Sequence, residues 1–126
     1  MRSKISSLLL SLALFLATPS LVGQNKKEAE MAGAVLFRDR GCTFCHGVGA
    51  VGTTKAPALT GLPTDKTWTT EKITEQILNG GQKMPPFRDS VTDEEVSDLI
   101  AYLRAKDKPI PPPAAPVSSA AGRPGL

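Results

Sequence analysis

The residues best able to bind a metal or a cofactor lie together in one short run of the chain. The sequence has two cysteines and one histidine, and all three occur in Cys42-Thr43-Phe44-Cys45-His46. Two thiols about one helical turn apart can form thioether bonds with the two vinyl groups of one haem. The adjacent histidine can then bind the iron. This Cys-x-x-Cys-His spacing predicts one covalent haem c, attached through Cys42 and Cys45, with His46 as an iron ligand.

Other chemistries of paired cysteines agree less well with the sequence. A structural zinc site takes four ligands, mostly Cys and His, and the chain offers only these three, two of them adjacent. A thioredoxin-like redox pair is expected near a strand–helix–strand pattern, which the sequence lacks. A disulfide across two residues closes too small a loop to add much stability. The sequence therefore favours haem attachment.

A second iron ligand follows by elimination. The chain has no second histidine, so a bis-histidine haem within one chain is excluded. Outside the N-terminal apolar segment, the methionine candidates are Met31 and Met84. Met31 falls among the apolar positions of an expected helix, where core packing is the simpler role. Met84 lies between Gly80-Gly81 and Pro85-Pro86, and these prolines stiffen the loop. We therefore predict Met84 as the second iron ligand, with ordinary gap filling as the alternative.

The elements that position these residues are expected to be helices joined by long loops. Apolar residues at helical spacing, Met31, Ala34 and Val35 with Phe37 as a further candidate, predict a first helix over residues 28–40 that Gly41 ends. Residues 47–66 are rich in Gly, Thr and Pro, and they predict a long loop with room for one short helical turn. Long loops of this kind in a small domain are usually functional.

Two further helices are expected after this loop. Thr69 or Thr70 can cap the first of them, and Asn79-Gly80-Gly81 ends it. Thr92 and Glu95 form a capping box for the last helix. Its apolar stripe consists of Val96, Leu99, Ile100 and Leu103. No period-two alternation is long enough for a sheet, so the sequence predicts an all-α domain.

The two ends of the chain differ from the predicted domain. Arg2 and Lys4 precede an apolar run from Ile5 to Ala17, which predicts an export signal over residues 1–23. An uncleaved membrane anchor is the alternative, although the run is shorter than the roughly 20 residues that span a bilayer. Residues 108–126 are dominated by Pro, Ala, Ser and Gly and predict a disordered tail. The folded haem domain is therefore assigned to residues 24–107, in the periplasm or an equivalent extracytoplasmic compartment.

Size and charge narrow the classes of function. So small a domain has a marginal core and usually needs a cofactor or a cross-link. Without Arg2 and Lys4, 13 basic residues face 12 acidic ones, and the two signs are interspersed. Basic and aromatic residues do not alternate, so nucleic acid is not an expected partner.

The helix pattern around the haem motif resembles that of class I monohaem c-type cytochromes. The resemblance covers residues 28–105, where Gly33 and Phe37 precede the haem motif and Leu99 and Tyr102 lie on the last helix. It implies a small helical domain wrapped around one haem. It also implies that the first and last helices cross, with the glycine allowing their close approach.

The same resemblance extends to the loops. Pro57 and Leu59 are similar to the family's Pro-x-Leu, and the implied role of the proline carbonyl is to accept a hydrogen bond from the His46 ring. Met84-Pro85-Pro86-Phe87 is similar to the family's methionine loop. Trp68 corresponds to a region where some relatives have a tryptophan that donates to a haem propionate, with a buried core indole as the alternative.

These features predict an electron carrier and not an enzyme. An iron with both axial positions filled is suited to outer-sphere electron transfer with redox partner proteins, whose identity the sequence does not give. Lys55, Lys83 and Arg88 could flank the haem edge and bias docking, or simply be solvated. A haem-bearing subunit of an oxidase or dehydrogenase complex is the first alternative. A haem sensor or peroxidase-like enzyme is the second, and it requires an iron that Met84 does not bind.

Overall fold

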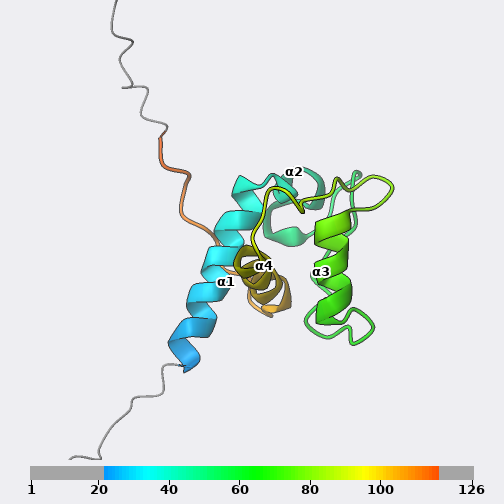
Figure 1. Ribbon diagram of the computed structural model, residues 1–126. Coiled ribbons are helices and arrows are strands. Elements are labelled where there is room, and N and C mark those ends of the chain that lie inside the picture. Colours follow the sequence, from blue (N-terminus) through cyan, green and yellow to red (C-terminus); the bar gives the residue numbers. More distant parts are fainter. Residues whose placement is uncertain (1–21, 117–126) are drawn as a thin grey trace, which may run out of the picture.

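The computed structural model describes the backbone of residues 22–116 and the side chains of residues 25–116. Most of the expected export signal and the last ten residues of the expected tail lie outside this range. The helices of these described residues are α1 (Val22–Asp39), α2 (Cys42–His46), α3 (Thr70–Asn79) and α4 (Asp93–Arg104), with a 3₁₀ turn η1 (Val48–Ala50) after α2 (Figure 1). In the part of the chain that the structure describes, all regular elements are helical, as predicted.

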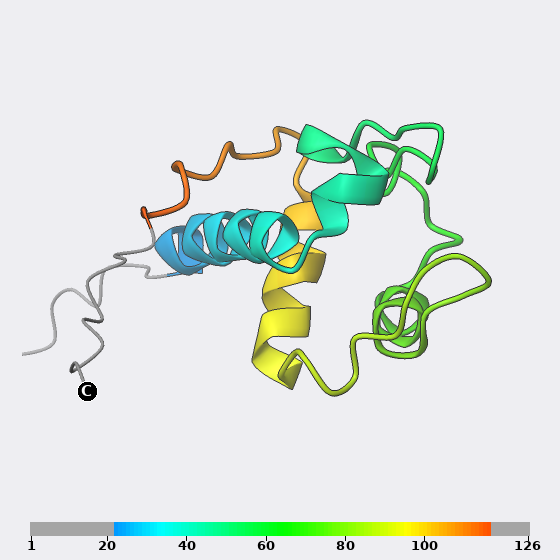
Figure 2. The ribbon, with the colours of Figure 1, turned by 90° about the horizontal axis from the view of Figure 1, so that it is seen from above.

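The crossing of α1 and α4 forms the centre of the domain (Figure 2). Gly33 makes the crossing possible, because a Cβ built on it would lie 2.0 Å from the backbone oxygen of Asp98 on α4. Next to this contact the rings of Phe37 and Tyr102 pack with centroids 5.2 Å apart. The two helices therefore approach to backbone contact, as the family resemblance implies.

The ends of α3 and α4 follow from local sequence signals. The Thr69 hydroxyl accepts a hydrogen bond from the Lys72 backbone N–H at the start of α3. At the start of α4 the Thr92 hydroxyl accepts from the Glu95 N–H, and the Glu95 carboxylate accepts from the Thr92 N–H. This reciprocal pair satisfies two N–H groups that have no partner inside the helix. Both predicted starts are confirmed.

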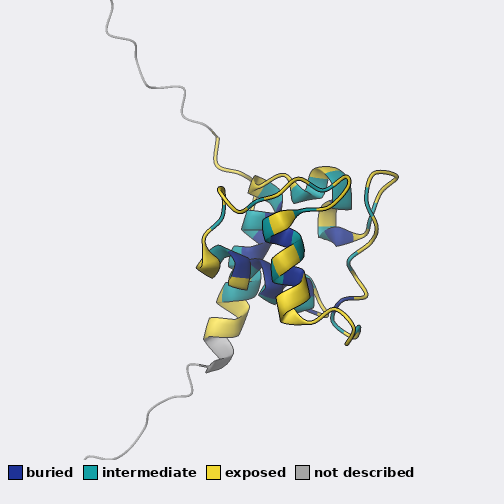
Figure 3. Cartoon of the chain, turned by 45° about the vertical axis from the view of Figure 1, so that its right-hand side comes forward, coloured by how far each residue is buried: buried dark blue, intermediate teal, exposed yellow. Residues whose placement is uncertain are grey.

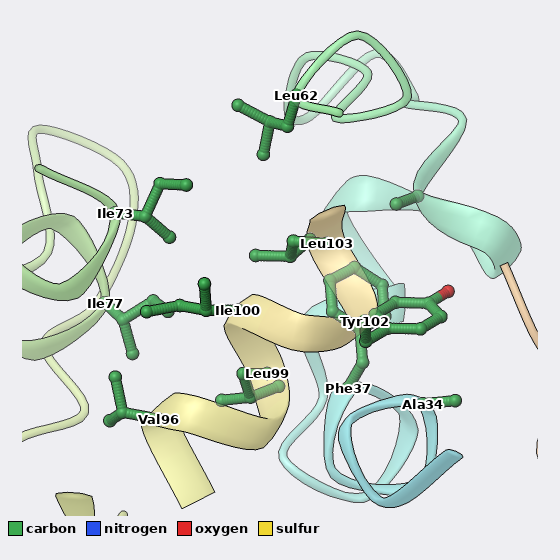
Figure 4. Close-up of a cluster of buried hydrophobic side chains, with 11 residues drawn as sticks. Ala34, Phe37, Leu62, Ile73, Ile77, Val96, Leu99, Ile100, Tyr102 and Leu103 are labelled. Atoms are coloured by element: carbon green, nitrogen blue, oxygen red, sulfur yellow. The ribbon is translucent and has the colours of Figure 1, made fainter. Parts of the chain in front are cut away.

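The buried residues lie mainly where the helices face one another, and the exposed ones lie on outer faces and loops (Figure 3). The close-up in Figure 4 shows Ala34 and Phe37 of α1 against the buried stripe of α4, while Ile73 and Ile77 of α3 point toward the same stripe from the other side. The stripe consists of the predicted residues together with Tyr102. The core is thus built mainly on α4.

Two expectations for α1 are wrong. The helix begins at Val22 and not at residue 28, because no proline or cluster of turn residues interrupts the sequence between them. Met31 is 38% exposed and is not a core residue. The face of α1 turned toward α4 consists of Gly33, Ala34 and Phe37, and Met31 lies beside this face.

The beginning of the expected tail contacts the domain. The Lys108 ammonium donates to the carbonyl oxygens of Tyr102, Leu103 and Ala105, which are the last acceptors of α4. Farther along, the Arg38 guanidinium of α1 donates to the Pro112 carbonyl. Within residues 22–116, no helix is both long and apolar enough to cross a membrane.

Candidate haem site

A cavity of about 770 Å³ lies between α2, α3, the long loop after α2 and the loop after α3. It has the size and the largely apolar wall of a cofactor site. Its lining brings together all six residues that the sequence analysis singled out: Cys42, Cys45, His46, Pro57, Trp68 and Met84.

The cavity also explains why the hydrophobic core of this small domain is marginal. Ile73 of α3 and Leu62 of the long loop face Leu103 of α4 in Figure 4, and all three line this space. The apolar interior of the domain therefore surrounds a volume that the chain's own side chains do not fill.

Helix α2 presents the cysteines to the cavity. Gly41, with φ of 78°, turns the chain sharply between the end of α1 and the first cysteine. Cys42 and Cys45 are both free thiols of intermediate burial, and burial raises the pKa of the Cys42 thiol above its usual value. The single turn of α2 places both sulfurs on the lining of one cavity, as thioether bonds to one haem require.

The ring of His46 is held by the long loop. Its Nδ1 lies 2.9 Å from the carbonyl oxygen of Pro57. Because a carbonyl only accepts, the proton of the neutral ring belongs on Nδ1, which leaves Nε2 with a free lone pair. This is the form of histidine that binds a metal. The loop is held in turn by hydrogen bonds from Gly52 N–H to His46 O and from Leu59 N–H to Ala50 O, at 2.7 and 2.8 Å.

The loop that contains Met84 folds back onto the end of α3. Gly80 has φ of 69°, and a Cβ on it would lie 2.4 Å from the Met84 carbonyl oxygen, so only glycine allows this return. The N–H of Gly81 donates to that carbonyl at 2.8 Å, and the N–H of Phe87 donates to Ile77 O at 3.1 Å. The backbone on both sides of Met84 is thus fixed, and its sulfur lies 3.8 Å from the Gln76 amide nitrogen.

The loop that forms the cavity wall around Trp68 is hydrogen-bonded to α4 through the side chain of Arg104. The Arg104 guanidinium donates to Leu62 O at 2.7 Å and to Asp65 O at 3.3 Å, and it also donates to Trp68 O. Trp68 lines the cavity and is 39% exposed, so it is not the buried core indole that was the alternative expectation.

Two contributors to this wall were not found from the sequence. Gln76 directly precedes Ile77 on α3, and its polar side chain is ordinary for an amphipathic helix. Arg104 reads as a basic residue in the last turn of a helix, where it is common for reasons of the helix dipole. The acceptors of Arg104 are backbone carbonyls in an irregular loop, and these have no signature in the sequence.

Comparison with protein families matches residues 28–103 to the family described as cytochrome c oxidase, cbb3-type, subunit III. The chain belongs to this family of c-type cytochromes. It is 28% identical over 93 residues to cytochrome c6 of Synechocystis sp., in a match that covers 71% of this chain and 77% of that protein.

Solved structures of c-type cytochromes are similar as well. XoxG from Methylobacterium extorquens AM1 matches with a TM-score of 0.56 and 28% identity, over 67% of this chain and 57% of that one. Cytochrome cL from Methylophaga aminisulfidivorans matches with a TM-score of 0.54 and 30% identity, over 66% of this chain and 58% of that one. This cytochrome thus spans less than two thirds of either structure.

The family and the cavity agree on the cofactor. Members of this family bind haem c, and the apolar cavity with two thiols and an oriented imidazole on its lining fits that group. The protein is a monohaem c-type cytochrome, and its haem serves electron transfer.

Proposed function

We propose that this cytochrome carries single electrons between redox proteins in an extracytoplasmic compartment, on a haem held by Cys42 and Cys45 with His46 and Met84 as axial ligands. The observation that supports this most is the pairing of an oriented imidazole and a loop-fixed thioether on the lining of one cavity. When bound, the haem supplies a reversible Fe(III)/Fe(II) couple.

Each residue has a separate task in this proposal. The Pro57 carbonyl keeps the proton on Nδ1 of His46, so that Nε2 is available to the iron. The neutral thioether of Met84 favours the ferrous state and raises the potential. The apolar lining acts in the same direction, because it disfavours the more highly charged ferric state. If His46 and Met84 both bound the iron, they would leave it no position for oxygen or a substrate. Trp68, which lines the cavity, would offer its indole N–H to a haem propionate.

The visible and near-infrared spectra of the holoprotein, oxidised and reduced, test the ligands. The oxidised protein should show the weak charge-transfer band of sulfur-ligated ferric haem. Met84→Ala should abolish the band, lower the potential and allow the ferrous protein to bind carbon monoxide. Met31→Ala is the matched control, because Met31 lies on the exposed side of α1 and should leave the band intact. A high-spin ferric spectrum in the unmodified protein would refute the carrier proposal in favour of sensing or catalysis.

A second candidate is a fixed haem relay inside a larger redox enzyme. The name of the matched family, a subunit of a cbb3-type oxidase, favours it. Purification from the native source under mild conditions distinguishes the two. A diffusing carrier elutes as a monomer, whereas a fixed relay co-purifies in constant ratio with a large catalytic subunit.

A further inference from the structure

Prolines restrict almost the whole segment that follows α4. From Lys108 to Pro116, every residue except Ala114 is either a proline or directly precedes one. Proline fixes its own φ at about −65° and excludes the helical region for the residue before it. The segment is therefore confined to an extended backbone of the polyproline II type. In agreement, the structure gives residues 108–116 no helix, turn or bend, and none of the backbone–backbone hydrogen bonds among the described residues includes them.

One side of this segment is exposed along its whole length. A polyproline II helix has three residues per turn, so Ile110, Pro113 and Pro116 follow one another along the same side. All three are exposed, and Ile110 is 84% exposed. The other two sides begin at Pro109 and Pro111, which are both half-buried. We call Ile110, Pro113 and Pro116 the proline ridge, which is about 19 Å long at the rise of such a helix.

Two basic side chains hold the start of the segment on the domain. The Lys108 ammonium donates to carbonyls at the end of α4, and the Arg38 guanidinium of α1 donates to the Pro112 carbonyl. Pro112 comes directly before the exposed tetrad Pro113-Ala114-Ala115-Pro116. From these anchors the segment leaves the helices beside α1 (Figures 1 and 2). The domain therefore presents the proline ridge from a fixed starting point, which a mere flexible linker would not need.

The chemistry of the proline ridge selects the kind of partner. Prolines have no N–H to donate, so the segment cannot pair with a sheet edge, and the ridge itself carries no charge for an ionic surface. Grooves lined by aromatic rings, in contrast, accept segments with the spacing Pro-x-x-Pro, which the tetrad after Pro112 has. Because the backbone is extended before it binds, little conformational entropy is lost on docking.

We propose that the proline ridge docks into a groove lined by tyrosine or tryptophan rings on a partner protein. Pro113 and Pro116 fill the groove, and Ile110 extends the contact toward the domain. The partner is thereby held beside α1. This interaction goes beyond the proposed electron transfer and does not depend on which residues bind the iron.

An SH3 domain that binds Pro-x-x-Pro peptides is the probe for this chemistry. When it is added to the isotopically labelled holoprotein, the NMR resonances of residues 108–116 should shift, while those of α3 should stay in place. The double variant Pro113→Ala/Pro116→Ala should weaken this binding about tenfold or more. Ala114→Ser is the matched control, because Ala114 is exposed in the same tetrad but lies off the ridge, and it should leave the affinity unchanged. No binding, or equal affinity of the double variant, would overturn the proposal.

Crosslinking from the ridge in the native source tests for a natural partner. A photo-crosslinking residue at position 110 should give a protein adduct that is lost in the Pro113→Ala/Pro116→Ala background and is competed away by a peptide of residues 108–116. The same crosslinker in place of Lys27, an exposed residue of α1, should not capture that protein. Absence of an adduct, or an adduct that survives the double variant, would contradict the docking proposal alone. An open, carbon monoxide-binding iron in the unmodified protein would instead refute the proposed function.

Discussion

The substitution Gly33→Ala is expected to open the crossing of α1 and α4. A Cβ at this position would lie 2.0 Å from Asp98 O and 2.7 Å from the Tyr102 Cβ, whereas ordinary contacts begin at 3.4 Å. Two of the three nearest atoms belong to the backbone of α4, so no side-chain rotation relieves the clash. The helices must therefore separate by more than an ångström, and the packing of Phe37 on Tyr102 loosens with them.

The expected loss of stability is a balance of destabilising and stabilising effects. Overpacking of a close-packed interior costs about 1–3 kcal/mol, with the upper end expected where backbone is the obstacle. The weakened aromatic pair adds about 0.5–1.5 kcal/mol. Replacing glycine by alanine inside a helix returns about 1 kcal/mol. The net loss is about 3 kcal/mol, which for a domain of this size lowers the melting temperature by about 12–24 °C.

Thermal unfolding of the holoprotein, followed by circular dichroism, measures this loss. Lys27→Ala is the matched control, because Lys27 is an exposed residue of the same helix, away from the crossing. This control should stay within about 0.5 kcal/mol of the unmodified protein. If Gly33→Ala and Lys27→Ala unfold at the same temperature, the crossing does not depend on the glycine and the reasoning is refuted.

Two further predictions concern α4. Arg104→Met should free the loop that ends at Trp68. The backbone amides of this loop should then exchange hydrogen at least about tenfold faster, while those of α1 should not change. Faster exchange in both segments would instead show a general loss of stability. Hydrogen bonds from the Thr92 N–H and the Arg40 guanidinium hold the pKa of Glu95 below its ordinary 4.5. The stability from this carboxylate is therefore complete above that pH and lost as the pH falls through the lower, folded value. Urea unfolding should show Glu95→Gln less stable than the unmodified protein at neutral pH but not in strong acid, and a gap that persists in acid would contradict the assignment.

Elements with local causes could be predicted from the sequence. Thr92 and Glu95 form their capping box within four residues, and the apolar stripe of α4 repeats over three turns, so both are visible in the sequence alone. The haem motif is equally local. The exposed position of Met31 could not be predicted, because which side of α1 is buried depends on where α4 crosses it. The contacts of Arg104 depend on loop carbonyls up to 42 residues away, which no local pattern encodes.

The residues assigned to the iron and to the His46 ring were not found from local helix patterns. The sequence selected Met84 by exclusion and Pro57 by resemblance, and the structure adds the contacts that hold them: the return of the loop over Gly80 and the hydrogen bond to His46. Both contacts depend on loops without a period, whose course follows from backbone hydrogen bonds. Iron ligation itself stays a prediction for the spectra to test.

The helices that close the domain are its first and its last, and this fixes an order of events as the chain is made. The partners Arg40 and Glu95, which join the two helices, are 55 residues apart in the sequence. Because synthesis proceeds from the N-terminus, α1 and the attachment cysteines exist well before α4 can pack on them. During that interval both thiols belong to an open chain, and once α4 has packed on α1 they line the cavity. The crossing that completes the domain is therefore made last, after both cysteines are already present in the chain.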